Sequence, residues 1–375
     1  MENNELINIA KNFKIDGEIV NIETCSSGHI NKTYALTYKK ENGESKKYIL
    51  QYVNTNVFPN LPELMENIKN VTSYMEEKAK QNGESLDRLT IKMIDTIDEN
   101  PNSIYDKNWR MEEFIDNTKT YLTTEDLNIL EEAGKAAGKF QKNLDGFPAE
   151  KLSEIIPKFH YTPNRVNQLK EAISNKQNIE NRKERFEKAK EAIDFVTDEK
   201  RLSKTNVITN LLENNEIPLR VTHNDTKLSN ILFDKDTNEA VCLIDLDTVM
   251  PGALCYDFGE GLRTGITTAK EDEADLSKIK IDINRFESYS KGFLGEVKNT
   301  LTQKELETLP LGVWMMTYEN AIRFLADYLN GDTYFSVDKN TKDHNLIRAK
   351  AQLEILRQLE EQEDKMKGVI NKYGF

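Results

Sequence analysis

The sequence predicts an α+β fold in which an N-terminal antiparallel sheet precedes a larger, mostly helical part. Two observations lead to this prediction. β-rich runs separated by turns dominate the chain up to Asn117, and apolar residues recur at helical spacing through most of the chain after it. We therefore divide the chain into residues 1–116 and residues 117–375.

The N-terminal part reads as strands around one helix. The predicted strands are rich in β-branched and aromatic residues and are bounded by turn residues: Ile19–Thr24, Thr33–Tyr38, Lys47–Val53, Leu89–Ile97 and Trp109–Ile115. The helix begins at Pro62, a favourable first-turn residue, and one apolar stripe follows it: Leu64, Ile68, Val71 and Met75.

The part after Asn117 reads as helices around a short β-rich island. Thr123 with Asp126 resembles a capping box at the start of the first helix. The highly charged segment Thr162–Val196 is typical of one or two solvent-exposed helices. The island spans residues 219–247, and residues 288–372 are helical again.

Composition excludes several classes of protein. The 51 Lys and Arg residues and the 64 Asp and Glu residues give a net charge of −13, which disfavours binding to nucleic acid. The three cysteines form no CxxC pair, so we expect no disulfide scaffold and a reducing compartment, the cytoplasm. No apolar run is long enough for a membrane span.

Three polar residues of the island can converge on one point. Asp225 and Asn230 lie just before the apolar strand Ile231–Phe233, and Asp245 lies at the far end of the next one, Ala240–Ile244. A polar turn joins the two strands, so they form a hairpin that returns the chain to its starting point. Taken singly, each residue is better explained as a turn former or a strand-end cap than as a catalytic residue.

Phosphoryl transfer needs this combination of side chains. A carboxylate receives the proton of the attacking hydroxyl, and an Asn with a second carboxylate holds Mg²⁺ against the nucleotide phosphates. The spacing HxDxxxxN, followed by an apolar strand that ends in Asp, matches the catalytic loop and metal-binding Asp of protein kinases. We assign Asp225 as the catalytic carboxylate and Asn230 and Asp245 as metal ligands, and expect His223 to fix the loop by packing and hydrogen bonding.

The sequence segments THNDTKLSNILFD, IDLDTVMPG and YDFGEGLRTG resemble motifs of the aminoglycoside phosphotransferase/choline kinase superfamily. SSGHINKTY, YILQYVNTNVF, WRMEEFI, IPKFHYT and ENAIRFLADYLNGDTYF are more similar to the N-acetylhexosamine 1-kinases. The resemblance implies a two-lobed kinase-like fold, ATP as co-substrate and Mg²⁺ as cofactor. It also implies transfer of phosphate to the anomeric hydroxyl of GlcNAc or GalNAc.

The nucleotide side departs from the general kinase pattern at one position. Ser27 and Gly28 lie between two predicted strands, where backbone N–H groups can cradle phosphates. The third strand carries Gln51 where kinases place a Lys, and Lys227 supplies a cation near the expected γ-phosphate. In kinases a Glu on a helix pairs with the Lys of this strand, and Glu63 and Glu66 are the two candidates for that Glu here.

The resemblance places the adenine-binding hinge at Glu113 and Ile115. It also makes Asp257 a support for the catalytic loop. Asp247 lies two residues beyond Asp245, so on a strand it points to the same face and is an additional candidate for sharing the metal.

The acceptor residues follow from the same resemblance: Arg323, Tyr334 and, from the N-terminal loop, His29. The competing interpretation of Arg323 is a surface ion pair with Asp327 at i, i+4 spacing.

Two rival functions stay open at this point. One is another kinase of the superfamily, with an aminoglycoside, choline, ethanolamine, homoserine or thio-sugar acceptor. The other is a nucleotide-binding pseudokinase, which is favoured only by Gln51.

Overall fold

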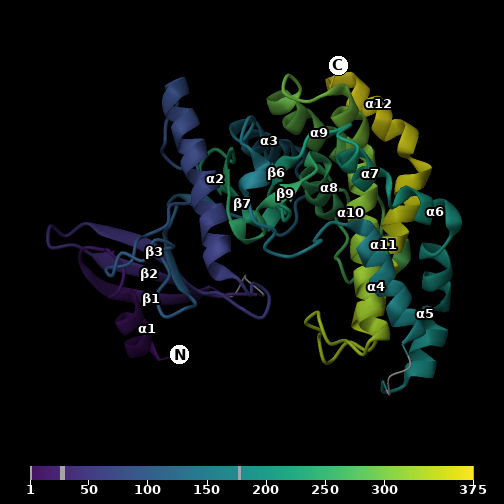
Figure 1. The fold of residues 1–375 in the computed structure, drawn as a ribbon, viewed down its shortest axis with the longest axis horizontal. Coiled ribbons are helices and arrows are strands. Elements are labelled where there is room, and N and C mark those ends of the chain that lie inside the picture. Colours follow the sequence, from purple (N-terminus) through teal and green to yellow (C-terminus); the bar gives the residue numbers. More distant parts are fainter. Residues whose placement is uncertain (1, 26–29, 176–178, 375) are drawn as a thin grey trace.

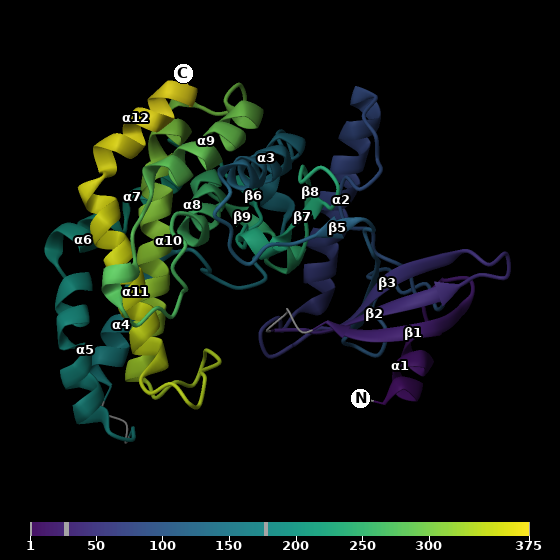
Figure 2. The same ribbon diagram turned by 180° about the vertical axis from the view of Figure 1, so that it is seen from behind.

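The chain forms two parts that lie side by side, an N-terminal sheet and a larger helical part, with the long helix α2 between them (Figures 1 and 2). The computed structural model describes residues 2–25, 30–175 and 179–374. The predicted α+β architecture is confirmed.

The N-terminal sheet has four antiparallel strands in the order β1-β2-β3-β4. Its elements are α1 (Asn3–Ala10), β1 (Glu18–Cys25), β2 (Lys32–Lys39), β3 (Ser45–Tyr52) and β4 (Trp109–Glu113). Because side chains alternate between the two faces of a strand, Leu50 and Met111 point into a small core that α1 covers. The opposite face of the same strands looks toward the helical part.

The segment predicted as a strand at Leu89–Ile97 forms only isolated bridges. Met93 pairs with Glu112 of β4, and Thr96 pairs with Phe13. The segment leaves the edge of β4 after these contacts because its two bridges point to different partners, so a continuous ladder does not develop.

Helix α2 (Leu61–Asn82) belongs to the core of the helical part. Its predicted apolar stripe is buried, and the helix ends at Gly83, whose φ of 70° favours glycine. The buried Asn67 side chain donates to the backbone carbonyls of Ser153 at 2.8 Å and Val249 at 2.9 Å. These bonds tie α2 to the chain on both sides of the predicted catalytic loop.

The helical part encloses a three-stranded sheet, β5-β7-β8, and a two-stranded sheet, β6-β9. Its strands are β5 (Thr118–Lys119), β6 (Arg220–Thr222), β7 (Ile231–Asp234), β8 (Ala240–Leu243) and β9 (Met250–Gly252). Its helices are α3 (Leu127–Asn143), α4 (Thr162–Ser174), α5 (Arg182–Val196), α6 (Glu199–Lys204), α7 (Val207–Glu213), α8 (Leu254–Gly265), α9 (Ile283–Val297), α10 (Gln303–Leu329), α11 (His344–Glu361) and α12 (Glu363–Gly374).

Two features of the helical part are the N-cap of α3 and the crossing of α8 with α10. The N-cap of α3 is Asp126, whose side chain accepts from the Asn128 N–H at 2.8 Å, so the capping box expected from Thr123 is wrong. Helices α8 and α10 cross at Gly259 and Gly312, where the backbones approach so closely that a Cβ on either glycine would overlap the other helix. This crossing holds α8, which contacts the predicted catalytic loop through Asp257, against α10.

Candidate active site

The hairpin β7–β8 brings the predicted catalytic residues together. The carboxylate Oδ2 of Asp225 accepts from Lys227 Nζ at 2.7 Å and from Asn230 Nδ2 at 2.8 Å. Asn230 Nδ2 also donates to the Asp225 carbonyl at 2.9 Å. The Asp225 and Lys227 side chains are 26% and 39% exposed, so a substrate can reach both.

His223 fixes the loop, as predicted. Its buried ring contacts the Ile244 carbonyl through Nε2 at 3.0 Å, and Nδ1 accepts from the Asp225 N–H at 3.3 Å. A carbonyl only accepts and an N–H only donates, so the contacts require the neutral Nε2–H tautomer. Burial lowers the pKa of His223, which favours this neutral form.

Asp257, on α8, supports the loop from behind. Its fully buried carboxylate accepts from the backbone N–H groups of His223 at 2.9 Å and Asn224 at 2.8 Å, and from Gln141 Nε2 at 2.7 Å. Its carbonyl accepts from the Thr226 hydroxyl at 2.6 Å. These bonds explain how Asn224 keeps a left-handed φ of 66° just before Asp225.

Asp245 lies just beyond β8 rather than within the strand. It adopts a left-handed φ of 63°, a conformation that Asp tolerates, and begins the short 3₁₀ turn Leu246–Thr248 that carries Asp247. The expectation that Asp245 and Asp247 share a strand face is therefore wrong. Burial raises the pKa of Asp245 to about 7, and the nearby negative charges of Asp247 and Asp225 act in the same direction.

The side chains around Asp245 fit a divalent cation. Among the described residues, neither the Asp245 carboxylate nor Asn230 Oδ1 accepts a hydrogen bond, so both offer oxygen ligands. No group of three or more His, Cys, Asp or Glu side chains suited to a metal occurs in the described part of the chain. Mg²⁺ sites commonly use one or two carboxylates together with substrate phosphates.

A buried arginine that sequence reasoning missed lies beside Gln51. Arg110 on β4 pairs directly with Gln51 across the sheet, and its Nε and Nη2 donate to Gln51 Oε1 at 2.9 and 2.8 Å. Its Nη1 forms an ion pair with Asp247 Oδ1 at 2.5 Å, and Asn31 Nδ2 donates to the other Asp247 oxygen at 2.7 Å. This network joins the N-terminal sheet to the turn beyond Asp245.

The signal for Arg110 was present in the sequence as a charge between the apolar residues Trp109 and Met111. The Gln51 amide nitrogen faces Thr33 Oγ1 at 3.3 Å, so both ends of this side chain already have partners within the sheet. A phosphate contact by Gln51 stays a prediction. Neither Glu63 nor Glu66, the two candidates for an acidic partner of the sheet, forms an ion pair in the described part of the chain. The carboxylate that pairs with Arg110 is Asp247.

The predicted hinge residues lie at and just after the end of β4. The Glu113 side chain forms an ion pair with Lys46 at 2.6 Å. The Ile115 N–H makes no hydrogen bond with any described residue and so remains a free donor. Ser27, Gly28 and His29 lie outside the described residues.

The predicted acceptor residues occupy the end of α10 and the loop that follows it. Arg323 forms no pair with Asp327; its guanidinium lies over the rings of Phe159 at 5.7 Å and Phe335 at 5.3 Å. Asp327 instead accepts from the N–H groups of residues 333–335 at 2.8–2.9 Å and so shapes the loop. Tyr334 in this loop is 67% exposed. The loop projects toward the N-terminal sheet in both views (Figures 1 and 2).

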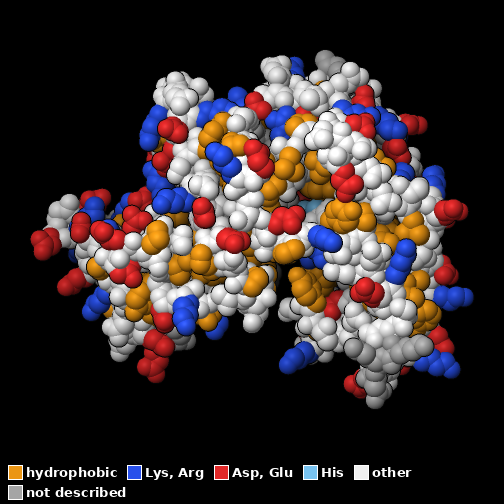
Figure 3. All heavy atoms as spheres, in the orientation of Figure 1, with side chains coloured by type: hydrophobic (Ala, Val, Ile, Leu, Met, Phe, Trp, Pro, Cys, Tyr) orange, Lys and Arg blue, Asp and Glu red, His pale blue; other side chains and the backbone are white. Residues whose placement is uncertain are grey.

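A cavity of about 330 Å³ lies between the loop that carries Phe159 and the catalytic loop. His160, Tyr256 and Asn224 line it, and Phe159 connects it with Arg323. The His160 Nδ1 contacts Glu319 Oε2 at 2.8 Å. The space-filling view shows a notch between the sheet and the helical part, bordered by hydrophobic and charged side chains (Figure 3).

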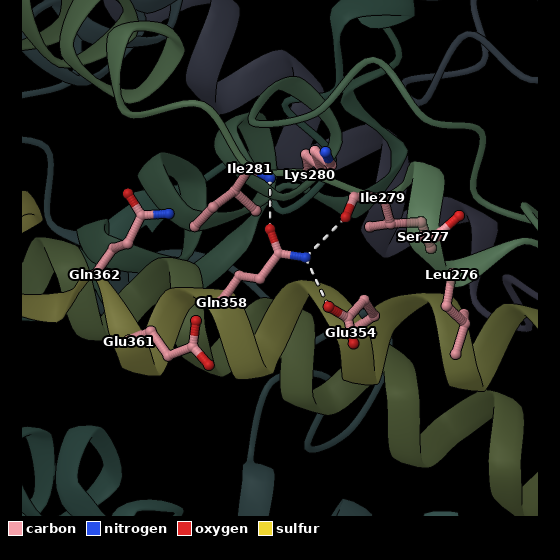
Figure 4. A pocket seen from close by; sticks show the side chains of 9 residues that line it. All are labelled: Leu276, Ser277, Ile279, Lys280, Ile281, Glu354, Gln358, Glu361 and Gln362. Carbon is pink, nitrogen blue, oxygen red and sulfur yellow. Dashed lines mark hydrogen bonds between the residues drawn. The ribbon is translucent and has the colours of Figure 1, made fainter.

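A second depression lies elsewhere, between α11 and the residues 276–281 (Figure 4). Gln358 spans it: its amide nitrogen donates to the Ile279 carbonyl and Glu354, and its oxygen accepts from the Ile281 N–H. None of the predicted site residues lines this depression, and its polar groups serve to pack α11.

The fold and this arrangement of side chains define a kinase-like phosphotransferase. Residues 21–282 match the model of the "Phosphotransferase enzyme family", and the chain belongs to that family. Choline kinase from Cryptosporidium parvum Iowa II is similar in fold, with a TM-score of 0.59, 14% identity and 100% of each chain covered. Plasmodium vivax ethanolamine kinase has a TM-score of 0.54 and 14% identity, covering 90% of this chain and 84% of its own.

An aminoglycoside phosphotransferase from Alicyclobacillus acidocaldarius is also similar, with a TM-score of 0.55, 11% identity and 96% of each chain covered. At such identities the likeness is one of fold. A separate finding is that no helix among the described residues is both long and apolar enough to cross a membrane.

Proposed function

We propose that the protein transfers the γ-phosphoryl group of ATP to the anomeric hydroxyl of an N-acetylhexosamine, with Mg²⁺ as cofactor. The observation that best supports phosphoryl transfer is the Asp225 carboxylate, held by Lys227 and Asn230 beside Asp245. We also propose the boundary at residues 116 and 117 as the division between a nucleotide-binding part and an acceptor-binding part.

In this proposal Asp225 orients the acceptor hydroxyl and receives its proton, while Lys227 offsets the charge of the transferred group. Asp245 and Asn230 Oδ1 are the metal ligands, with Asp247 adjoining them. Bound Mg²⁺ would neutralise the phosphate oxygens. The site works by positioning and electrostatic stabilisation, without a covalent enzyme intermediate.

The choice of a sugar rests on the sequence resemblance and on the surroundings of Arg323. Arg165 lies close enough to Arg323 for their charges to interact, and burial together with this repulsion lowers the pKa of Arg165. Two guanidinium groups beside the aromatic rings of Phe159 and Phe335 disfavour a cationic acceptor such as choline. A neutral sugar that offers hydroxyl and amide oxygens suits these donors.

An ATP-consumption assay over a panel of acceptors tests the proposal. The panel holds GlcNAc, GalNAc, glucose, choline, ethanolamine, homoserine, a thio-sugar and an aminoglycoside, and ³¹P NMR identifies the phosphorylated position. Turnover confined to the N-acetylhexosamines, with an anomeric phosphate as product, is the expected result. Turnover of another member of the panel in their place would assign the enzyme to that branch.

The pseudokinase alternative loses its support because of Arg110. Gln51 replaces a lysine, but a buried cation lies directly across the sheet from it and meets a carboxylate of the catalytic part. An Asp225→Ala variant serves as the blank in the panel. ADP formation that is equal in wild type and Asp225→Ala, for every acceptor, would favour a binding protein.

A further inference from the structure

His160 carries a buried ring nitrogen that has no hydrogen-bond partner among the described residues. The residue follows Phe159 in the loop before α4, and its side chain is only 7% exposed. Nδ1 lies 2.8 Å from Glu319 Oε2, so this nitrogen has a partner. Nε2 is buried and contacts no donor or acceptor in the described part of the chain. Nearly all buried polar atoms in proteins are paired, so Nε2 needs a partner that these residues do not supply.

The contacts of Glu319 determine what Nε2 can offer to such a partner. Glu319 lies on α10 with its side chain 1% exposed, and its Oε1 accepts from the Thr162 hydroxyl. A carboxylate oxygen only accepts, so the proton of a neutral His160 ring lies on Nδ1 and is donated to Glu319. Nε2 of this tautomer presents a lone pair. The partner of His160 must therefore donate a hydrogen bond.

His160 lines the cavity of about 330 Å³ beside the catalytic loop. Its ring packs against those of Phe159 and Tyr256, with centroids 4.4 and 5.2 Å away. Asn224, which directly precedes Asp225, lines the same cavity. Ligand pockets usually measure about 300–1,000 Å³ and combine apolar or aromatic walls with a few polar groups. The cavity has these properties, and it borders the loop that carries the catalytic carboxylate.

The charges around the cavity favour a neutral ligand. Arg165 lies close enough to Glu319 and Arg323 for both charges to act on it, so two guanidinium groups face one carboxylate. The exposed side chains of Glu154 and Lys158 also line the cavity, and their opposite charges balance. An ammonium group would meet the remaining positive charge. A hydroxyl group donates a hydrogen bond without carrying a charge, so it suits Nε2 better.

We propose that this cavity holds the part of the acceptor away from the reacting group, and that His160 Nε2 accepts a hydrogen bond from a hydroxyl that is not phosphorylated. His160 is then a specificity-determining residue, because an acceptor without a donor at that position leaves Nε2 unpaired. The inference rests on the proposed function, since it takes a sugar as the acceptor. It adds a contact on the loop before α4 to those proposed for Arg323 and Tyr334.

A cycle that combines a protein variant with altered sugars tests the contact. The sugars are GlcNAc and its 3-deoxy, 4-deoxy and 6-deoxy analogues, and kcat/KM is measured at saturating Mg·ATP. For the wild type, removing the hydroxyl that His160 contacts should lower kcat/KM about 10–100-fold, the range expected when a buried acceptor is left unpaired. His160→Asn keeps an amide donor for Glu319 but lacks Nε2. In this variant the loss at one position should shrink to about threefold or less, while the losses at the other two positions and the ATP KM stay as in the wild type.

A deoxyfluoro sugar tests the direction of the hydrogen bond. Fluorine in place of the contacted hydroxyl has no hydrogen to donate, so the wild type should lose as much kcat/KM with this analogue as with the deoxy sugar. A fluoro analogue that is turned over as well as GlcNAc would show that Nε2 donates, which contradicts the inference. The comparison needs no variant, so it holds even if His160→Asn fails to fold.

His344→Asn is the matched control. The His344 side chain is also 7% exposed, but both of its ring nitrogens have partners and it does not line the cavity. This variant should leave all three deoxy losses as in the wild type. Equal losses in the wild type and His160→Asn at every position, or a wild type that turns over all three deoxy sugars as well as GlcNAc, would overturn the inference and leave Nε2 to a bound water. A wild type that phosphorylates neither GlcNAc nor GalNAc would instead refute the proposed function, and with it a sugar hydroxyl as the partner of His160.

Discussion

Replacing Arg110 by Met should destabilise the protein more than any other single change in the N-terminal sheet. The side chains of Arg110 and Asp247 are only 4% and 3% exposed, so the ion pair is shielded from water. Removing one partner of a buried pair leaves an uncompensated charge and costs about 3–5 kcal/mol. The Gln51 oxygen also loses two donors, each worth about 0.5–1.5 kcal/mol.

The expected loss is therefore about 4–6 kcal/mol of unfolding free energy, since Met recovers part of the buried surface of the Arg stem. Domains usually have only about 5–15 kcal/mol in all, so the variant should be marginally stable at 25 °C. Adding Asp247→Asn should recover part of the loss, because it removes the unpaired charge.

Urea unfolding followed by circular dichroism, with the midpoint and slope compared, is the appropriate assay. Lys46→Met is the matched control: it breaks a pair with Glu113 on the same two strands, where the side chains are 34% and 32% exposed. That control should cost at most about 1 kcal/mol. If Arg110→Met loses no more than Lys46→Met, the argument from burial is refuted.

Four other outcomes follow from the site. Asp225→Asn should lower kcat by about 10²–10⁴-fold while calorimetry finds Mg·ATP affinity within about threefold of wild type. Asp257→Ala leaves three buried donors without their acceptor, so thermal unfolding should show a loss of at least about 3 kcal/mol. Burial raises the pKa of Glu112 to about 7, so wild-type stability should fall as pH rises from about 4.5 through 7. Glu112→Gln should accordingly gain about 1–3 kcal/mol over wild type in urea unfolding at pH 8, and no such gain at pH 4. Arg323→Met should raise the acceptor KM about 10–100-fold and leave the ATP KM unchanged, and a similar rise in both KM values would contradict its acceptor role.

The sequence was most informative where one short segment contains all the geometry. Asp225, Asn230 and the hairpin to Asp245 span about one loop and two strands, so local spacing fixes their approach. The predicted strands β1 to β4 follow from alternation and turns, which are also local. Asp257 was predicted through resemblance, and its bonds to the loop bear this role out.

The sequence was least informative where residues far apart in the chain meet. Arg110 and Asp247 are separated by 137 positions, and nothing local marks them as partners. The strand expected at 89–97 failed for a related reason, since pairing depends on the strand edge that the segment meets and not on its own propensity. Asp327 is a further example. Its i, i+4 spacing suggested an ion pair with Arg323, but its carboxylate instead accepts hydrogen bonds from backbone N–H groups of the next loop.

The hydrogen bonds from the Asn67 side chain on α2 to the Ser153 and Val249 carbonyls have a consequence for which part of the protein unfolds first. In protein kinases the position of a helix next to the N-terminal sheet controls activity. Here α2 shares the large core and is fastened to Ser153 and Val249. The cooperative unit seen by amide hydrogen exchange should therefore include residues 61–82 together with the C-terminal part, leaving the sheet as the unit that opens first. The expected boundary between the two exchange units then lies within the first 116 residues, between the sheet and α2, and not at residue 117.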